Sequence, residues 1–138
     1  MKLRRRYELE CAHRLTKGLS PNHKCRRLHG HRYILTLEVE GPVFDTDGMI
    51  IEYSDLDSVV GPIIRLIDHH DLNTLNERCS TVLGGRVSEN PTVELLAEWF
   101  GHRLQHVIAG ARGGKGIRLK LTAVYLEEDS NASVVWEP

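Results

Sequence analysis

The sequence predicts an α+β domain in which two helices cover one face of a four-stranded antiparallel sheet. Apolar and polar residues alternate in four segments, and two segments between them repeat apolar residues at intervals of three and four. The resulting order, strand, strand, helix, helix, strand, strand, is typical of such domains. We expect residues 1–138 to form a single domain, long enough to bury a core without disulfides.

The N-terminal part supplies two predicted strands joined by a long loop. Odd-numbered residues are mostly apolar and even-numbered ones mostly charged over residues 3–13, and residues 31–39 alternate in a similar way. His29 and His31 are two residues apart and are therefore expected to point to the same face of the second strand. Residues 14–30 show no periodicity, and a loop of this length usually signals function or disorder.

Two predicted helices follow the second strand. Ser54 is the expected N-cap of the first helix, which ends at residues 68–71. Pro62 lies inside this helix, so we expect a bend or a fresh first turn there. The second helix is expected to begin near Asn90, with Pro91 in the first helical position.

The other segments are predicted to be connections and strands. Residues 72–90 look irregular, and residues 110–116 are expected to form a turn because they lack the residue order of a phosphate-binding loop. Two strands follow, over residues 117–127 and 133–136. Glu127 continues the apolar side of the first of these strands, which is a costly place for a carboxylate unless a partner meets it.

Composition limits the classes of function. A net charge of -1 argues against nucleic-acid binding. No apolar run is long enough to span a membrane or to form a signal peptide, and three cysteines without repeated spacing favour a reducing, cytoplasmic setting. The two edges of the predicted sheet make a homo-oligomer formed by edge pairing a reasonable expectation.

Three histidines are candidates for a metal site: His13 at the end of the first strand, with His29 and His31 at the start of the second. A single inward histidine is more often a core residue than a ligand. Three that converge beside a cysteine favour a metal ion, and Zn²⁺ suits imidazole ligands. Spacing alone leaves open whether His13 meets the other two.

Two further groups are candidates for proton transfer. Cys25 has three interpretations: an inert buried thiol, a zinc ligand, or a thiolate favoured by neighbouring cations that acts as a base or nucleophile. Residues 68–71 read Asp-His-His-Asp and offer a carboxylate and an imidazole that could exchange protons near neutral pH. Alternatively, this segment is only a polar helix end with histidines near the negative end of the dipole.

Five motifs occur in order along the chain: Ala12-His13-Arg14-Leu15; His23-Lys24-Cys25 with Leu28-His29-Gly30-His31; Gly48-Met49-Ile50-Ile51 with Asp55-Leu56; Asp68-His69-His70 with Leu72-Asn73; and Asn90-Pro91-Thr92 with Glu94. Together they resemble the 6-pyruvoyltetrahydropterin synthase family over about residues 7–136. The spacing Cys-x-x-x-His-Gly-His resembles the 6-carboxytetrahydropterin synthase branch of queuosine biosynthesis more than the pyruvoyl branch.

The resemblance implies a role for each matching residue. It implies three zinc ligands: His13, His29 and His31. It makes Cys25 the catalytic base, and Asp68 with His69, rather than His70, a second proton-transfer unit. It implies that Glu127 anchors the pterin substrate, and that Thr92 and Glu94 lie near the pterin pocket.

The implied reaction is zinc-dependent: 7,8-dihydroneopterin triphosphate becomes 6-carboxy-5,6,7,8-tetrahydropterin, with release of acetaldehyde and triphosphate. Basic residues would hold the triphosphate, with Lys24, Arg26 and Arg27 as candidates. The same site could instead form 6-pyruvoyltetrahydropterin or cleave dihydroneopterin. A pterin-binding homologue without turnover is a further alternative, but it would need neither Cys25 nor the Asp68–His69 pair.

The resemblance also implies the tunnelling fold (T-fold). In this fold, sheets from several subunits close into a barrel, commonly as a trimer or hexamer, with active sites between subunits. The chain departs from the family pattern at Glu128, where threonine is usual, and at Val93, where a hydroxyl residue is common. Residues 77–89 form a longer segment than is typical and could reshape the pocket.

Overall fold

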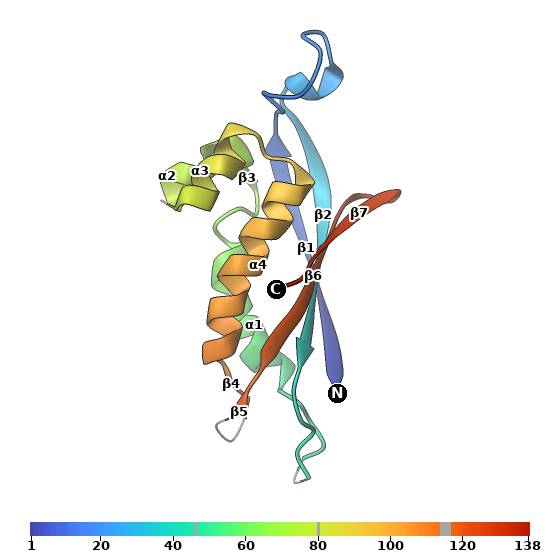
Figure 1. Cartoon of the computed structure of the whole chain (residues 1–138), viewed down its shortest axis with the longest axis vertical. Coiled ribbons are helices and arrows are strands. Elements are labelled where there is room, and N and C mark those ends of the chain that lie inside the picture. The colour runs from blue at the N-terminus through green and yellow to red at the C-terminus, as the bar shows by residue number, and fades with distance from the viewer. Residues whose placement is uncertain (46, 80, 114–116) are drawn as a thin grey trace.

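A five-stranded sheet forms one layer of the molecule, with strand order β3-β1-β2-β6-β7 (Figure 1). The structure, a computed structural model, describes residues 1–45, 47–79, 81–113 and 117–138. The sheet strands are β1 (Lys2–His13), β2 (His29–Glu40), β3 (His70–Asp71), β6 (Lys120–Asp129) and β7 (Ala132–Trp136). The four longer strands are antiparallel neighbours, as predicted, and the short β3 adds a parallel pairing to β1.

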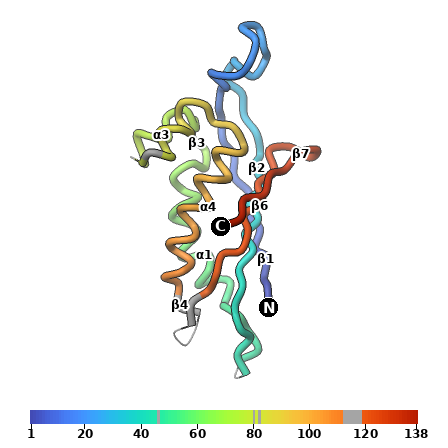
Figure 2. Tube along the Cα trace, viewed as in Figure 1, coloured from blue at the N-terminus to red at the C-terminus, as the bar shows by residue number. Residues whose placement is uncertain are grey.

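The helices lie on one side of this sheet (Figures 1 and 2). They are α1 (Tyr53–Ile64), α2 (Leu75–Arg78), α3 (Val82–Glu89) and α4 (Val93–Gly110), with 3₁₀ turns η1 (Lys24–Arg26) and η2 (Leu72–Thr74). The α+β prediction is confirmed, but residues 72–90 are more regular than expected because they contain η2, α2 and α3. None of the helices in the described part of the chain is long and apolar enough to cross a membrane.

The connection between α4 and β6 contains two short strands, β4 (Arg112–Gly113) and β5 (Ile117–Arg118). The turn predicted for residues 110–116 falls partly on residues 114–116, which lie outside the described residues. The strand predicted to start at residue 117 is divided into β5 and β6.

The core lies between the sheet and the two long helices. The predicted alternation in β1 is confirmed, because Leu9, Cys11 and His13 are buried while their even-numbered neighbours Glu8 and Glu10 are exposed. The largest fully buried side chains come from both layers: Trp99, Tyr33, Phe100, Leu9, Leu35 and Leu37. This packing fixes the face of β1 and β2 on which the histidines lie.

The helix ends differ from the prediction by a few residues. Glu52, not Ser54, is the N-cap of α1, and the Ser54 hydroxyl donates to the Glu52 carboxylate at 2.8 Å. Pro62 lies in the last turn of α1, and the helix ends at Ile64 rather than at residues 68–71. The N-cap of α4 is Thr92, which places Pro91 before the helix.

A β-bulge in β6 changes which of its residues face the helices. Val39 of β2 pairs with Leu121, but the preceding Glu38 pairs with Ala123, so one residue of β6 is left over. Because side chains alternate between faces, this extra residue reverses the side on which all later residues of β6 lie.

The reversal corrects the prediction for Glu127. Glu127 pairs with Ile34, and it therefore shares the face of the even-numbered residues of β2, opposite the histidines. The inward position belongs to Glu128, whose carboxylate accepts a hydrogen bond from the buried Tyr33 hydroxyl at 3.0 Å.

Candidate metal centre and active site

Three imidazoles meet where β1 ends and β2 begins. The antiparallel register pairs His13 directly with His29, and His31 follows two residues later on the same face. Their candidate ligand nitrogens all lie within 4.8 Å of one another. The register thus answers the question that spacing left open, because it brings His13 to the other two histidines.

Backbone carbonyls fix which nitrogen of two of these rings faces inward. His13 Nδ1 lies 2.7 Å from the Pro91 carbonyl oxygen, and His29 Nδ1 lies 2.8 Å from that of Arg27. A carbonyl only accepts, so each Nδ1 carries the proton and donates it. The two Nε2 atoms lie 3.1 Å apart, and their lone pairs remain available to bind a metal ion. Metal-binding histidines usually have this arrangement.

The donor set fits a zinc ion. Zn–N bonds of about 2.0–2.1 Å in a tetrahedron place ligand atoms about 3.3 Å apart, close to the His13–His29 separation. Burial lowers the pKa of His13, so its imidazole stays neutral and keeps the lone pair that a metal needs. Three protein ligands would leave one coordination position open.

Glu128 and Tyr33 lie next to the three imidazoles, on the same face of the sheet. Glu128 Oε1 is 3.5 Å from His13 Nε2 and 3.7 Å from His31 Nε2. Burial raises the pKa of the Tyr33 hydroxyl, which therefore remains protonated and donates to Glu128. Glu128 was not among the predicted site residues, because only the bulge in β6 turns it inward.

Cys25 shares a hollow with two of the histidines. The hollow has a volume of about 500 Å³ and is lined by Lys24, Cys25, Arg27, Leu28, His29 and His31. The backbone of Cys25, within η1, is held by hydrogen bonds from its N–H to His23 Nδ1 and to its carbonyl from the Leu15 N–H. The guanidinium of Arg26 instead donates to the Thr16 carbonyl, so Arg26 is engaged elsewhere.

Asp68 and His69 form the pair that the sequence predicted. Asp68 Oδ1 lies 3.0 Å from His69 Nδ1 and also accepts from the Glu10 N–H at 2.9 Å. His69 has a φ of 61°, a conformation that is uncommon for residues other than glycine. Such conformations cluster at functional sites. The pairing partner is His69 and not His70, which bonds to the Asp68 carbonyl instead.

This pair does not share a hollow with Cys25. The exposed His69 ring lines a separate hollow with Glu10, Ala12 and Arg32, and His31 contributes to both hollows. Glu10, Ala12 and Arg32 lie on the sheet face opposite the histidine cluster. Within one chain, the predicted catalytic residues are therefore divided between two places.

The predicted pterin-binding residues of α4 have mainly structural partners. The Thr92 hydroxyl caps the helix by accepting from the Leu95 N–H at 3.4 Å, and Glu94 is exposed in the first turn. The contact between this segment and the histidine cluster is made by Pro91, through the carbonyl that holds His13.

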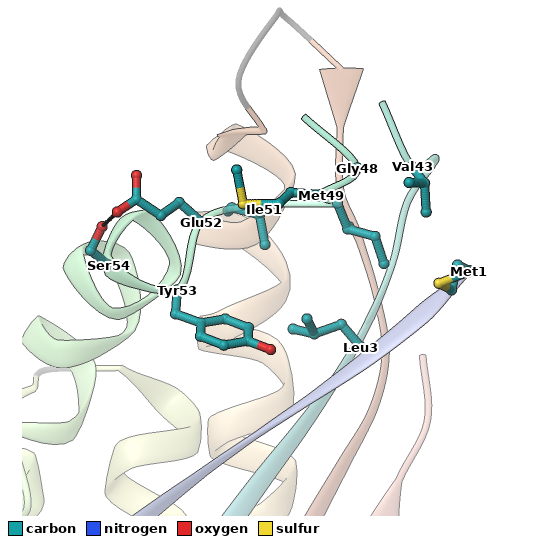
Figure 3. A pocket seen from close by; sticks show the side chains of 10 residues that line it. Met1, Leu3, Val43, Gly48, Met49, Ile51, Glu52, Tyr53 and Ser54 are labelled. Atoms are coloured by element: carbon teal, nitrogen blue, oxygen red, sulfur yellow. Dashed lines mark hydrogen bonds between the residues drawn. The ribbon is translucent and has the colours of Figure 1, made fainter. Parts of the chain in front are cut away.

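An apolar hollow of about 450 Å³ lies near the other end of β1 (Figure 3). It is lined by Met1, Leu3, Val43, Gly48, Met49, Ile50, Ile51, Glu52, Tyr53 and Ser54. Glu52 supplies the one carboxylate among the described lining residues, and this carboxylate accepts a hydrogen bond from the Ser54 hydroxyl. This hollow lacks the groups needed for metal binding and proton transfer, but it leaves Met49 and Tyr53 about half exposed.

Comparison with known proteins gives matches over most of the chain. A family profile described as 6-pyruvoyl tetrahydropterin synthase matches residues 2–138. A dihydroneopterin monophosphate aldolase of Pyrococcus furiosus is 25% identical over 109 residues, covering 79% of each chain. A 6-carboxy-5,6,7,8-tetrahydropterin synthase of Synechocystis sp. is 31% identical over 113 residues, covering 78% of this chain and 75% of the relative.

A solved structure supports the same fold. The 6-pyruvoyl tetrahydropterin synthase of Caenorhabditis elegans superposes with a TM-score of 0.78, covering 100% of this chain and 95% of that one. The sequence identity is 22%, so this likeness is evidence for the fold alone. The T-fold expected for the subunit is thereby confirmed.

Proposed function

Because the chain belongs to the 6-pyruvoyl tetrahydropterin synthase family, whose members act on pterins, we propose a specific reaction for it. We propose that it is a zinc-dependent lyase that converts 7,8-dihydroneopterin triphosphate and water to 6-carboxy-5,6,7,8-tetrahydropterin, acetaldehyde and triphosphate. The observation that carries the proposal is the convergence of three imidazoles, two of which, His29 and His31, share a hollow with Cys25. The name of the Synechocystis relative supports the carboxy product.

The three histidines would hold zinc through inward nitrogens, which for His13 and His29 are the Nε2 atoms left free by their carbonyl contacts. Bound zinc supplies Lewis-acid polarisation of substrate oxygens, which eases removal of neighbouring protons. The pairing of His13 with Pro91 and of His29 with Arg27 keeps the rings oriented, so little reorganisation is needed on binding.

Cys25 and the Asp68–His69 pair would move the protons. Cys25 lies at the hollow that contains His29 and His31, where its sulfur can accept a proton from the substrate side chain as a base. Asp68 is fixed by the Glu10 N–H and orients His69 through Nδ1. The exposed Nε2 of His69 is then the atom that exchanges a proton.

We assign the pterin anchor to Glu128 rather than Glu127. The sequence resemblance pointed to Glu127, but the bulge turns that side chain to the opposite sheet face. The Glu128 carboxylate lies in the histidine-lined interior and can accept hydrogen bonds from the amino and ring N–H groups of a pterin. Its second oxygen has no hydrogen-bond partner among the described residues, so it remains available.

The candidates for holding the triphosphate reduce to two. Lys24 and Arg27 line the hollow beside Cys25, whereas Arg26 donates to the Thr16 carbonyl. An arginine suits this role because its planar guanidinium can contact two phosphate oxygens at once.

We propose that the active site is completed between subunits of a trimer or hexamer. The separation of His69 from Cys25 within one chain supports this arrangement. The sheet also has free edges: residues 2–10 of β1 lack a strand partner on the outer side in the described structure, and β7 ends the sheet on the other side. The exposed apolar side chains of Figure 3 would be covered by such an assembly.

The test is mass spectrometry of the products after zinc-loaded protein is mixed with 7,8-dihydroneopterin triphosphate. We expect 6-carboxytetrahydropterin and acetaldehyde from the wild type, and no turnover with retained zinc from Cys25→Ala. A 6-pyruvoyl product would keep the site and change the reaction. The name of the Pyrococcus furiosus relative makes aldol cleavage of a dihydroneopterin the second candidate, which the same assay detects as 6-hydroxymethyl-7,8-dihydropterin and glycolaldehyde triphosphate. Bound zinc and pterin without turnover would refute the catalytic proposal.

A further inference from the structure

A second pocket lies between α3 and α4, away from the histidine cluster. It has a volume of about 440 Å³ and is lined by Thr81, Leu83, Arg86, Trp99, His102, Arg103 and His106. Figures 1 and 2 show α3 beside α4 on the side away from the sheet. One wall thus comes from residues 77–89, the segment that is longer than expected and has no part in the proposed reaction.

The other wall is one continuous stripe of α4. Trp99, His102, Arg103 and His106 follow one another at steps of three, one and three residues, so they share a helix face. A surface helix normally carries its apolar residues toward the core and scattered polar residues outside. Here two imidazoles and a guanidinium are gathered beside an indole.

The pocket is positively charged. None of its described lining residues carries a carboxylate, while Arg86 and Arg103 contribute two permanent positive charges. Outside the lining, Glu98 Oε2 lies 3.5 Å from Arg86 Nη1, at the limit of a hydrogen bond. The Arg103 Nη2 contacts the buried Cys79 sulfur, and its other N–H groups have no acceptor among the described residues.

Trp99, one of the residues that line the pocket, carries a buried donor without an acceptor in the described part of the chain. Trp99 is fully buried, and no described residue supplies a hydrogen-bond partner for its Nε1. Buried polar groups are nearly always paired, and an unpaired one costs about 1–3 kcal/mol.

We propose that this pocket binds a small organic phosphate, with the phosphate at Arg86 and Arg103 and an apolar group against Leu83 and Trp99. Guanidinium groups bind phosphate oxygens through paired N–H donors. The imidazoles of His102 and His106, which have no hydrogen-bond partner in the described parts of the chain, are placed to donate as well. This site is independent of the proposed reaction at the histidine cluster.

The experiment is isothermal titration calorimetry of the full zinc-loaded protein with phenyl phosphate and, separately, with inorganic phosphate. We expect phenyl phosphate to bind more tightly, since only it has an apolar group, and its affinity to fall with added salt. Arg86→Gln should weaken its binding about tenfold or more, because a charge-assisted contact is lost. Glu98→Gln should strengthen binding severalfold, because it releases Arg86.

Two matched variants separate this site from other phosphate sites. Arg65→Gln removes an exposed arginine after α1, outside the pocket, and should leave the affinity unchanged. Arg27→Gln removes a cation from the hollow beside Cys25, where the substrate's triphosphate is proposed to bind, and should leave the Arg86-dependent binding unchanged. The proposal is overturned if Arg27→Gln, and not Arg86→Gln, removes binding, or if no phenyl phosphate binds at millimolar concentration. Equal affinity for both phosphates would indicate an adventitious ion only and would also overturn it.

Discussion

The separation of Cys25 from His69 predicts that two inactive variants restore activity when they assemble together. Each residue lines a different hollow of its own chain, and the proposed shared site takes Cys25 from one subunit and His69 from another. Cys25→Ala and His69→Ala should each be inactive alone. In a random mixture of equal amounts, half of the Cys25 positions and half of the His69 positions are intact, so about a quarter of the sites contain both residues.

The assay is product formation by the whole oligomer population of two co-expressed variants, with two different purification tags used to verify that the chains are present in equal amounts. The matched control mixes wild type with the double variant Cys25→Ala/His69→Ala. A site shared between subunits gives about a quarter of wild-type activity in both mixtures, by the same counting. A site within one chain gives about one half in the control and none in the complementary pair. That second pattern would refute the shared-site reasoning.

Three further predictions follow from the geometry around the site. Glu128→Gln should raise KM for the pterin substrate about tenfold or more, while Glu127→Gln, on the other sheet face, should change KM less than about twofold. Arg27→Glu should raise KM for the triphosphate with little change in kcat, whereas Arg26→Gln should chiefly lower Tm, which thermal denaturation would detect. Hydrogen bonds from Lys2, Thr122 and Arg4 hold the pKa of Glu38 at about 2, below its ordinary value of 4.5. The ionised Glu38 carboxylate therefore contributes its full stabilisation at pH values above its ordinary pKa. This contribution is lost as the pH falls toward about 2, so the Tm difference between wild type and Glu38→Gln should shrink over that range.

The sheet was predictable where one face of a strand packs evenly on the helices. Residues 3–13 and 31–39 alternate because each inward residue meets the core, and the pattern survives in β1 and β2. In β6 the same argument failed after Leu121, because a bulge depends on how Glu38 and Ala123 pair across strands. No local pattern in residues 117–127 records that pairing.

The short helix α3 was missed for a related reason. Gly84 and Gly85 favour a loop when they are judged by helix propensity alone. In the structure, a side chain at Gly84 would collide with the backbone oxygen of Cys79, so the close approach of two segments requires glycine there. The Thr81 hydroxyl caps the helix by accepting from the Gly84 N–H. Tertiary contact therefore outweighs propensity in this segment.

The motif Asn90-Pro91-Thr92 illustrates how sequence located the site without revealing how its parts act. The motif was expected near a pterin, yet its three residues have separate partners within the chain. The Asn90 side-chain oxygen accepts from the Thr16 N–H at 2.9 Å and so holds the loop before β2. The Pro91 carbonyl fixes the proton of His13 on Nδ1, and the Thr92 hydroxyl caps α4. A single turn of chain thus connects the loop, the imidazole of His13 and helix α4, which gives these residue types a structural reason that does not depend on substrate contact.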